Sequence, residues 1–335
     1  MKRLFVPLLL LIFLTFLVIA GFFWWTSNSK PPSKDTSLKN FLISKGTSAS
    51  IIGERLYKEG FIHNPLAFKI YVQVTGASEK IPAGEYRLTA NLSLPELVGE
   101  LLKGPSEIWV TIPEGLRREE IVERYIQALE IKEPEAGDLR GEFLSLSKND
   151  EGYLFPDTYL FPKTANASLI FKKMLEVFDT RIDAKLKDSI SESSYSLRQI
   201  IILASIIERE TKTDEERPIV AGILSKRLKA GWPLQTDATL QYAVASENCK
   251  LKIENCKWWP TLTEEDLNVN SPYNTYKYAG LPPTPIASPG TSSIKAVVYP
   301  QDSPYWFYIH DSGGQIHFAK TLEEHNSNIR TYLGK

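Results

Sequence analysis

The chain has 335 residues, of which 43% are hydrophobic and 24% charged, and its formal net charge is −1. This length and composition are typical of a folded protein of about two domains and exclude a largely disordered chain. The balanced charge, with no block of lysines and arginines, argues against a nucleic-acid-binding role.

The N-terminal segment predicts a membrane anchor. Leu4 to Trp25 carries no charged residue, and at about 1.5 Å per residue a helix of this length crosses a hydrocarbon core of roughly 30 Å. The basic pair Lys2-Arg3 precedes the run, and Trp24-Trp25 ends it, where indoles favour the lipid–water boundary. We expect residues 1–25 to form a cytoplasmic tip and a transmembrane helix. A cleaved signal peptide is the competing interpretation, which the length of the run and the lack of an A-x-A site disfavour.

A small mixed module is expected over residues 38–105, after a serine- and proline-rich linker at 26–37 that is expected to be flexible. Its predicted elements are a helix capped by Ser48, a helix that begins at Asn64-Pro65, a half-buried strand over 84–89, and a helix with a Ser93 and Glu96 capping box that ends at Gly104.

A larger α+β domain is expected over residues 106–335. The patterns predict a strand at 108–112, helices at 121–129, 200–207 and 214–229, alternating segments around 306–318, and a short helix through Leu333. The segment 151–162 is rich in aromatic residues and proline and is expected to be an ordered loop. Its rings would either stack on the faces of sugars or be packed within the protein.

The stretch 198–211 carries the first candidate catalytic residue. Ile200 to Ile207 is apolar except for Ser205, which predicts a largely buried helix, and the helix runs directly into acidic residues at Glu208 and Glu210. A carboxyl group at the end of such a helix is a candidate acid. The alternative is a helix that simply ends in solvated charges.

Helical spacing distinguishes the two carboxyl groups. Glu210 lies above Ile207 and Leu203, whereas Glu208 lies above Ser205. Apolar surroundings disfavour the ionised form and raise the pKa of a carboxyl group toward neutrality. Glu210 is therefore the preferred candidate for a proton donor.

Metal chemistry is not expected. The spacing of the four histidines matches no ligand set, and we expect neither a metal nor a cofactor. The histidines are His63, His310, His317 and His325. The two cysteines, Cys249 and Cys256, are close enough in sequence for a local disulfide, and free thiols are the alternative.

With metal chemistry set aside, the candidate groups are carboxyl groups supported by amides, hydroxyls and aromatic rings, and these fit cleavage of a glycosidic bond. Ordinary glycosidases use two carboxylates, and Asp237 and Glu208 are candidate partners for Glu210. A second route needs one carboxyl group only. If the C6 hydroxyl of the sugar attacks its own anomeric carbon, one residue acts first as acid and then as base, and the product is an internal anhydro-sugar.

Five motifs in this order resemble the endolytic murein transglycosylases of the MltG/YceG-like family. They are ASIIERET at Ala204 to Thr211, LQTD at Leu234 to Asp237, YNTY at Tyr273 to Tyr276, GLPP at Gly280 to Pro283 and IASPG at Ile286 to Gly290. Glu151-Gly152 and LFPDTY at 154–159 also match. The resemblance covers essentially the whole chain, including the anchor and a module at 38–105 similar to LysM-like glycan-binding domains.

The resemblance implies a single-pass protein of the bacterial inner membrane with an extracytoplasmic catalytic domain. Such a protein cuts nascent peptidoglycan strands between MurNAc and GlcNAc, leaves 1,6-anhydro-MurNAc ends and could thereby terminate glycan elongation. The catalytic acid falls on Glu210. Substrate-binding candidates are Gln235, Asp237, Tyr273, Asn274, Thr275 and Tyr276.

Peptidoglycan strands are the expected substrate, and peptidoglycan synthases or division proteins are candidate partners. The alternatives are a lysozyme-like hydrolase on the same scaffold and a non-catalytic, membrane-anchored peptidoglycan-binding protein. Residues 246–267 depart from the family pattern, since they contain both cysteines and Trp258-Trp259. This segment is expected to be an insertion or variable loop beside the cleft.

Overall fold

The computed structural model describes residues 2–249 and 256–334. The chain forms two compact units, an N-terminal unit of Met1–Trp109 with Leu160–Thr164 and a C-terminal unit of Val110–Tyr159 with Ala165–Lys335. The division after Trp109 lies close to the boundary expected at residue 106, whereas the inclusion of 160–164 in the N-terminal unit was not expected. The assignment of functional domains to these units stays a prediction.

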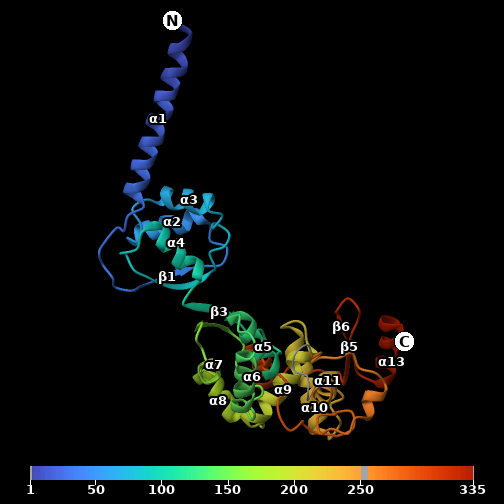
Figure 1. The fold of residues 1–335 in the computed structure, drawn as a ribbon. Coiled ribbons are helices and arrows are strands. Elements are labelled where there is room, and N and C mark those ends of the chain that lie inside the picture. The colour runs from blue at the N-terminus through green and yellow to red at the C-terminus, as the bar shows by residue number, and fades with distance from the viewer. Residues whose placement is uncertain (1, 250–255, 335) are drawn as a thin grey trace. The chain divides into compact units, whose positions relative to one another are not determined.

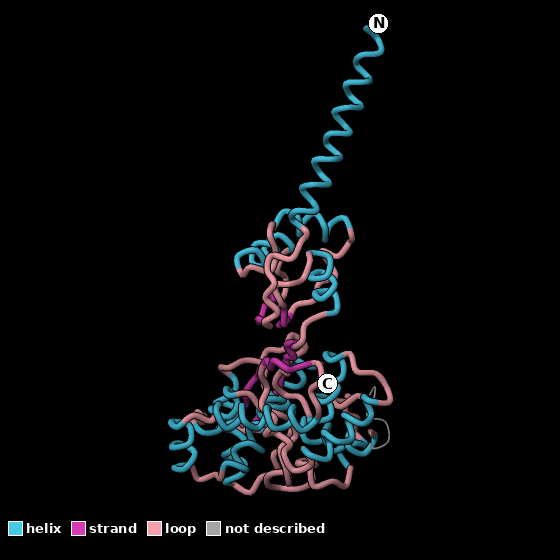
Figure 2. Tube along the Cα trace, turned by 60° about the vertical axis from the view of Figure 1, so that its left-hand side comes forward, coloured by secondary structure: helices cyan, strands magenta, loops and turns pink. Residues whose placement is uncertain are grey.

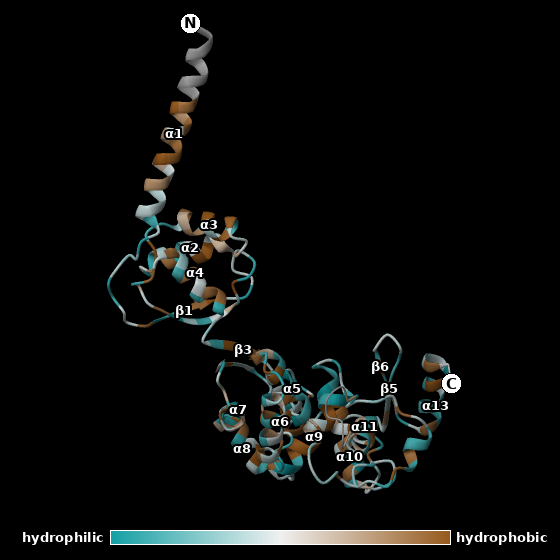
Figure 3. Ribbon diagram, in the orientation of Figure 1, coloured by the Kyte–Doolittle hydropathy of each residue, from teal (hydrophilic) through white to brown (hydrophobic). Residues whose placement is uncertain are grey.

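Helix α1 (Lys2–Asn28) is the apolar N-terminal helix of the first unit (Figures 1 and 3). Its 27 residues correspond to about 40 Å, and the window Leu11–Asn28 is apolar enough to cross a bilayer, as an anchor or a signal helix does. The following residues are attached to the unit, because Ser29 O accepts a 2.9 Å bond from Leu94 N and Ser33 N donates a 3.1 Å bond to Ala90 O. The linker at 26–37, which was expected to be flexible, is therefore hydrogen-bonded to the N-terminal unit at Ser29 and Ser33.

The rest of the N-terminal unit combines helices with antiparallel strands. Its elements are β1 (Lys39–Ile43), α2 (Ala49–Lys58), α3 (Pro65–Val74), β2 (Gly84–Leu88) and α4 (Leu94–Lys103), followed by β3 (Glu107–Thr111). The strand order is β1-β2-β3-β4, where β4 is Thr158–Pro162, and Phe41 lies opposite Tyr86. The predicted caps at Ser48 and Asn64 and the Ser93 and Glu96 capping box are confirmed.

The C-terminal unit is mainly helical, and Figure 2 distinguishes its helices from its few strands. Its elements are β4 (Thr158–Pro162), which ends in the N-terminal unit, α5 (Arg118–Leu129), α6 (Glu135–Leu146), α7 (Ala167–Arg181), α8 (Ala184–Glu192), α9 (Leu197–Glu210), α10 (Glu216–Lys229), α11 (Asp237–Asn248), the 3₁₀ turn η1 (Glu265–Asn268), α12 (Thr291–Val298), the hairpin strands β5 (Phe307–His310) and β6 (Ile316–Ala319), and α13 (Leu322–Leu333). The predicted α+β class is confirmed.

Helix α9 forms the centre of the C-terminal unit. Every residue from Ile200 to Ile207 is buried, and α9 packs against α10, α11 and α12. A capping box between Ser196 and Gln199 begins the helix. The predicted buried helix is confirmed, and its position is fixed by neighbours on several sides.

The segment 151–162 differs from the expected loop, because its last five residues form β4. The rings of Phe155, Tyr159 and Phe161 are buried, and Tyr159 Oη donates a 2.5 Å bond to Phe155 O. These rings are therefore part of the protein interior, and the interpretation as a packed segment is the one that the structure supports.

A close backbone approach at Gly222 gives a test of the packing around α10. A Cβ atom at Gly222 would lie 2.1 Å from the carbonyl oxygen of Gln301, so we expect Gly222→Ala to lower the free energy of unfolding by about 1–3 kcal/mol. Gly141 is the matched control, since no atom lies within 4 Å of its Cβ position in α6. Thermal unfolding of both variants, followed by circular dichroism, measures the difference, and equal melting temperatures would contradict the packing.

Candidate active site

The carboxyl group of Glu210 lies between the ends of two helices. Glu210 is the last residue of α9, and its Oε1 accepts a 3.1 Å bond from the backbone N–H of Ala238, in the first turn of α11. Its Oε2 accepts a 3.0 Å bond from the hydroxyl of Tyr308 on β5. The side chain is thus held by two donors from separate elements, while the residue keeps partial solvent exposure.

Burial raises the pKa of Glu210 from its ordinary value of 4.5 to about 7. The negative charge of Asp237 also raises the pKa, and the N–H of Ala238, the hydroxyl of Tyr308 and the charge of Arg227 lower it. The C-terminal end of α9 carries partial negative charge, which disfavours the carboxylate in the same direction as burial. Glu210 can therefore be protonated at neutral pH and still be stabilised after it loses the proton.

Glu210 lines a pocket of about 410 Å³. The lining residues are Glu210, Arg227, Gln235, Asp237, Tyr276, Phe307, Tyr308, Ile309, His310, Leu322, His325 and Leu333. Three of the predicted substrate-binding residues, Gln235, Asp237 and Tyr276, are therefore brought together with Glu210. Tyr276 Oη donates a 2.6 Å bond to Asp237 Oδ1, which couples the loop at 273–276 to the start of α11.

Tyr273, Asn274 and Thr275 do not line this pocket. Asn274 and Thr275 are buried, and Asn274 Nδ2 donates 2.9 Å bonds to the carbonyls of Leu267 and Val269. The Tyr273 hydroxyl and the Thr275 hydroxyl also bond within the protein, to Thr284 at 2.7 Å and to Thr239 at 2.8 Å respectively. These three side chains fix the shape of the loop that carries Tyr276.

Sequence reasoning missed two of the groups that face Glu210. Tyr308 is 98 residues away in sequence, and only the β5–β6 hairpin brings its hydroxyl to the carboxyl group. Arg227 is 5% exposed and donates to the carbonyl oxygens of Trp306, at 3.0 and 2.7 Å, and of Leu234, at 2.5 Å. The alternating pattern around Tyr308 was the only local signal, and it indicated a strand without indicating a partner.

Glu208 lies in a different environment from Glu210. Its carboxylate accepts bonds from Arg217 at 3.1 Å and from Gly290 N and Ser293 Oγ at 2.8 Å each, and its side chain is 6% exposed. Glu208 therefore caps the N-terminus of α12 as half of a buried ion pair. It is not among the residues that line the Glu210 pocket, so the structure does not bring the two candidate carboxyl groups together.

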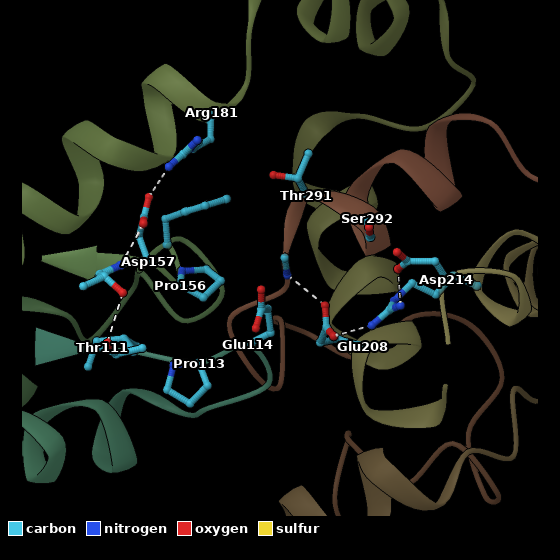
Figure 4. A pocket seen from close by; sticks show the side chains of 15 residues that line it. Thr111, Pro113, Glu114, Pro156, Asp157, Arg181, Glu208, Asp214, Thr291 and Ser292 are labelled. Atoms are coloured by element: carbon cyan, nitrogen blue, oxygen red, sulfur yellow. Dashed lines mark hydrogen bonds and ion pairs between the residues drawn. The ribbon is translucent and has the colours of Figure 1, made fainter. Parts of the chain in front are cut away.

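Glu208 borders the larger cavity of about 620 Å³ shown in Figure 4. Ion pairs between Asp157 and Arg181 and between Asp214 and Arg217 occupy its walls, and Glu114 lies between them. The acidic side chains of Asp157, Glu208 and Asp214 are already paired with arginines. The smaller Glu210 pocket is the better candidate for acid catalysis.

The two cysteines are joined by a disulfide, Cys249–Cys256, which settles the alternative left open by the sequence. Beyond it, the ring of Trp259 stacks 3.8 Å from the Arg209 guanidinium, and Trp259 Nε1 donates a 2.9 Å bond to Glu120. The part of 246–267 after the disulfide is thus attached to the end of α9. Residues 250–255 of this segment lie outside the described residues.

No group of three His, Cys, Asp or Glu side chains is arranged to hold a metal ion in the part of the chain that the structure describes. The polar groups that line the pocket with Glu210 are a carboxylate, phenols, an amide, a guanidinium and the imidazoles of His310 and His325. Such groups can donate and accept protons and hydrogen bonds. This chemistry makes the pocket a candidate general acid–base site.

Comparisons with known proteins agree with this class of site. Residues 41–331 match the sequence profile of the YceG-like family, and the chain belongs to this family. It is 31% identical to the "Endolytic murein transglycosylase" of Bacillus subtilis (strain 168), over 95% of this chain and 91% of that protein. A protein of the same name from Streptococcus pneumoniae (strain D39) is 25% identical over 87% of this chain and 58% of its own length.

A solved structure supports the fold assignment. The 2.6 Å crystal structure of a YceG-like protein from Listeria monocytogenes aligns with a TM-score of 0.56 and 30% identity, over 87% of this chain and 99% of that one. The family resemblance carried by the five motifs is thereby confirmed.

The pKa of Glu210 predicts how glycan cleavage depends on pH. If this candidate acid must be protonated in the first step, its pKa of about 7 makes kcat/KM fall about tenfold per pH unit above pH 7. A pH–rate profile on isolated glycan strands measures this alkaline limb. A limb that begins near pH 5 would show that the carboxyl group is ionised in the free enzyme.

Tyr308→Phe is expected to move the same limb to higher pH. The hydroxyl lowers the pKa of Glu210 by donating to its carboxylate, so the loss of this bond raises that pKa further. Tyr305→Phe is the matched control, since Tyr305 stacks on Phe318 and does not line the pocket. If the alkaline limb of the pH–rate profile is unchanged in Tyr308→Phe, the hydrogen bond between Tyr308 and Glu210 is contradicted, however much the rate falls.

Proposed function

We propose that this protein is an endolytic peptidoglycan lytic transglycosylase that cleaves nascent glycan strands between MurNAc and GlcNAc. The observation that carries the proposal is the carboxyl group of Glu210, with a pKa near 7, in a pocket lined by polar and aromatic groups. Membership of the YceG-like family and relatives named endolytic murein transglycosylase support the substrate class.

The reaction needs one carboxyl group used twice. Glu210 donates its proton to the glycosidic oxygen, the bond from that oxygen to C1 of MurNAc breaks, and the GlcNAc side leaves with a free O4 hydroxyl. The C6 hydroxyl of the same MurNAc attacks C1 and gives its proton to the Glu210 carboxylate. The product is a 1,6-anhydro-MurNAc end, the acid is restored, and no water is consumed.

The surroundings of Glu210 suit this double role. Burial and Asp237 favour the protonated form that begins the reaction, whereas Ala238 N–H and Tyr308 Oη stabilise the carboxylate that exists midway. The charge of Arg227 acts in the same direction as these donors. The carboxylate is therefore a favourable intermediate state and also a competent base for the C6 hydroxyl.

We assign substrate contacts to the predicted residues that line the pocket. Gln235, Asp237 and Tyr276 would bind hydroxyl and acetamido groups of the sugars, each hydrogen bond contributing roughly 1 kcal/mol. Tyr273, Asn274 and Thr275 would act indirectly, by holding the loop that presents Tyr276. Their internal hydrogen bonds support this division of roles.

The N-terminal unit would provide attachment. We propose that α1 remains as a single-pass anchor in the bacterial inner membrane, that the catalytic unit is extracytoplasmic, and that residues 38–105 form a LysM-like glycan-binding module. The length and apolar character of α1 support the anchor. Cleavage close to the membrane would end the elongation of nascent strands, with peptidoglycan synthases or division proteins as partners.

A lysozyme-like hydrolase is the second candidate, because Asp237 places another carboxylate in the same pocket. Hydrolysis would use the two carboxyl groups together and add water to the anomeric carbon. The mass of the released saccharide separates the two reactions, since the anhydro product is lighter by one water. A non-catalytic wall-binding protein would release no product at all.

Glu210→Gln tests the proposal directly. The amide cannot donate the catalytic proton, so cleavage of isolated glycan strands should fall by about 10²–10⁴-fold or become undetectable. Glu215→Gln is the matched control, an exposed carboxylate at the start of α10. Mass spectrometry of the products of the unmodified protein should show anhydro ends.

The test has two contradicting outcomes. Full activity of Glu210→Gln, with an unchanged circular dichroism spectrum, would remove Glu210 from the mechanism. Products that carry an added water would keep Glu210 as the acid and establish the hydrolase instead.

A further inference from the structure

Helix α3 has a row of apolar side chains that stay exposed among the described residues of its unit. Leu66, Ile70 and Val74 are 54%, 40% and 82% exposed, and their spacing of four residues places them on one face of the helix. The opposite face carries Phe68 and Val72, which are buried in the core of the N-terminal unit. The helix is therefore apolar on both faces, and Figure 3 colours much of it as hydrophobic.

The row lies on the helix that contacts the end of α1. Trp25, the last residue of the apolar run, stacks on Tyr71 of α3, with ring centroids 5.5 Å apart and planes 21° apart. Trp25 also packs against the core cluster that contains Phe68 and Val72. The hydrogen bond from Leu94 N to Ser29 O fixes the chain directly after α1.

These contacts place α3 at a defined depth, given the proposed anchoring by α1. A paired indole at the end of a spanning helix lies at the lipid–water boundary, where amphipathic rings are favoured. Tyr71 is in direct ring contact with that indole. The helix that carries Tyr71 is therefore at the level of the lipid headgroups.

We propose that α3 lies on the bilayer surface at which α1 ends, with Leu66, Ile70 and Val74 inserted among the lipids. Interfacial helices bury an apolar face to a depth of about 5–10 Å at the boundary between headgroups and acyl chains. Lys69 lies beside the row, and Lys30 and Lys34 follow the anchor. Their ammonium groups can reach anionic headgroups while the lysine stems cover apolar surface.

Lipid is the occupant that the geometry selects over a second copy of the chain. The row is continuous with the surface of α1 through the contact between Trp25 and Tyr71, so a bilayer that surrounds α1 already reaches α3. The consequence is that the N-terminal unit has two attachments to the membrane, α1 and α3. Two attachments would restrict its rotation about the anchor and hold it where strands leave the membrane.

Site-specific fluorescence quenching in liposomes tests the proposal on the full-length chain. The sequence has only two cysteines, and both are in the disulfide, so a single introduced cysteine can be labelled with bimane. Val74→Cys and Leu66→Cys report on α3. Asn40→Cys, an exposed position on β1, is the matched control, and Leu14→Cys reports on the middle of α1.

Lipids brominated near the carboxyl ends of their acyl chains should remove most of the fluorescence at residues 74 and 66 and leave that at residue 40 unchanged. Lipids brominated near the chain ends should quench the label at residue 14. Quenching at 14 with no difference between 74 and 40 would overturn the surface contact and leave the anchor in place. No quenching of the label at residue 14 would overturn both the surface contact of α3 and the membrane anchoring by α1.

A second copy gives a distinct result that also overturns the proposal. Protein covering α3 would protect the label at residue 74 from a water-soluble quencher in proportion to the protein-to-lipid ratio, without quenching by brominated lipid. Agreement between Leu66→Cys and Val74→Cys guards against a local effect of either substitution, since both side chains are largely exposed.

Discussion

The carboxyl group of Glu210 is held between two helix ends of opposite polarity, and the chemistry of the site depends on that position. Its own helix, α9, presents a partial negative charge to it, whereas the first turn of α11 donates the N–H of Ala238. Burial favours the neutral acid, and Tyr308 favours the carboxylate. The two protonation states are therefore close in free energy near pH 7, as a group that serves as acid and then as base requires.

The last turn of α9 is fixed by three consecutive side chains that contact three different parts of the chain. Glu208 caps α12, Arg209 stacks on Trp259 beyond the disulfide, and Glu210 meets α11. The buried residues from Ile200 to Ile207 prevent the helix from rotating or sliding among its neighbours. The carboxyl group is thus placed by rigid elements, which favours a reproducible distance to a bound sugar.

The sequence was sufficient to predict those features of the fold and site that depend on contacts between residues close together in the chain. Helical spacing placed Glu210 over Ile207 and Leu203, and the capping residues of the small module defined its helices. It was not sufficient where contacts are distant, since nothing near Tyr308 indicates that it reaches Glu210 across 98 residues. The family resemblance implied that all four YNTY residues bind substrate, but it did not show that the Asn274 amide is used inside the loop, because hydrogen-bond partners depend on the fold.

The protonation state of Glu210 is the central claim, and infrared difference spectroscopy measures it without reference to turnover. The carbonyl stretch of a protonated carboxyl group is identified as the band that disappears in the difference between the unmodified protein and Glu210→Gln. Titration of that band should give a midpoint near pH 7. A midpoint between about pH 4 and 5, the range of an ordinary glutamate, would contradict the account.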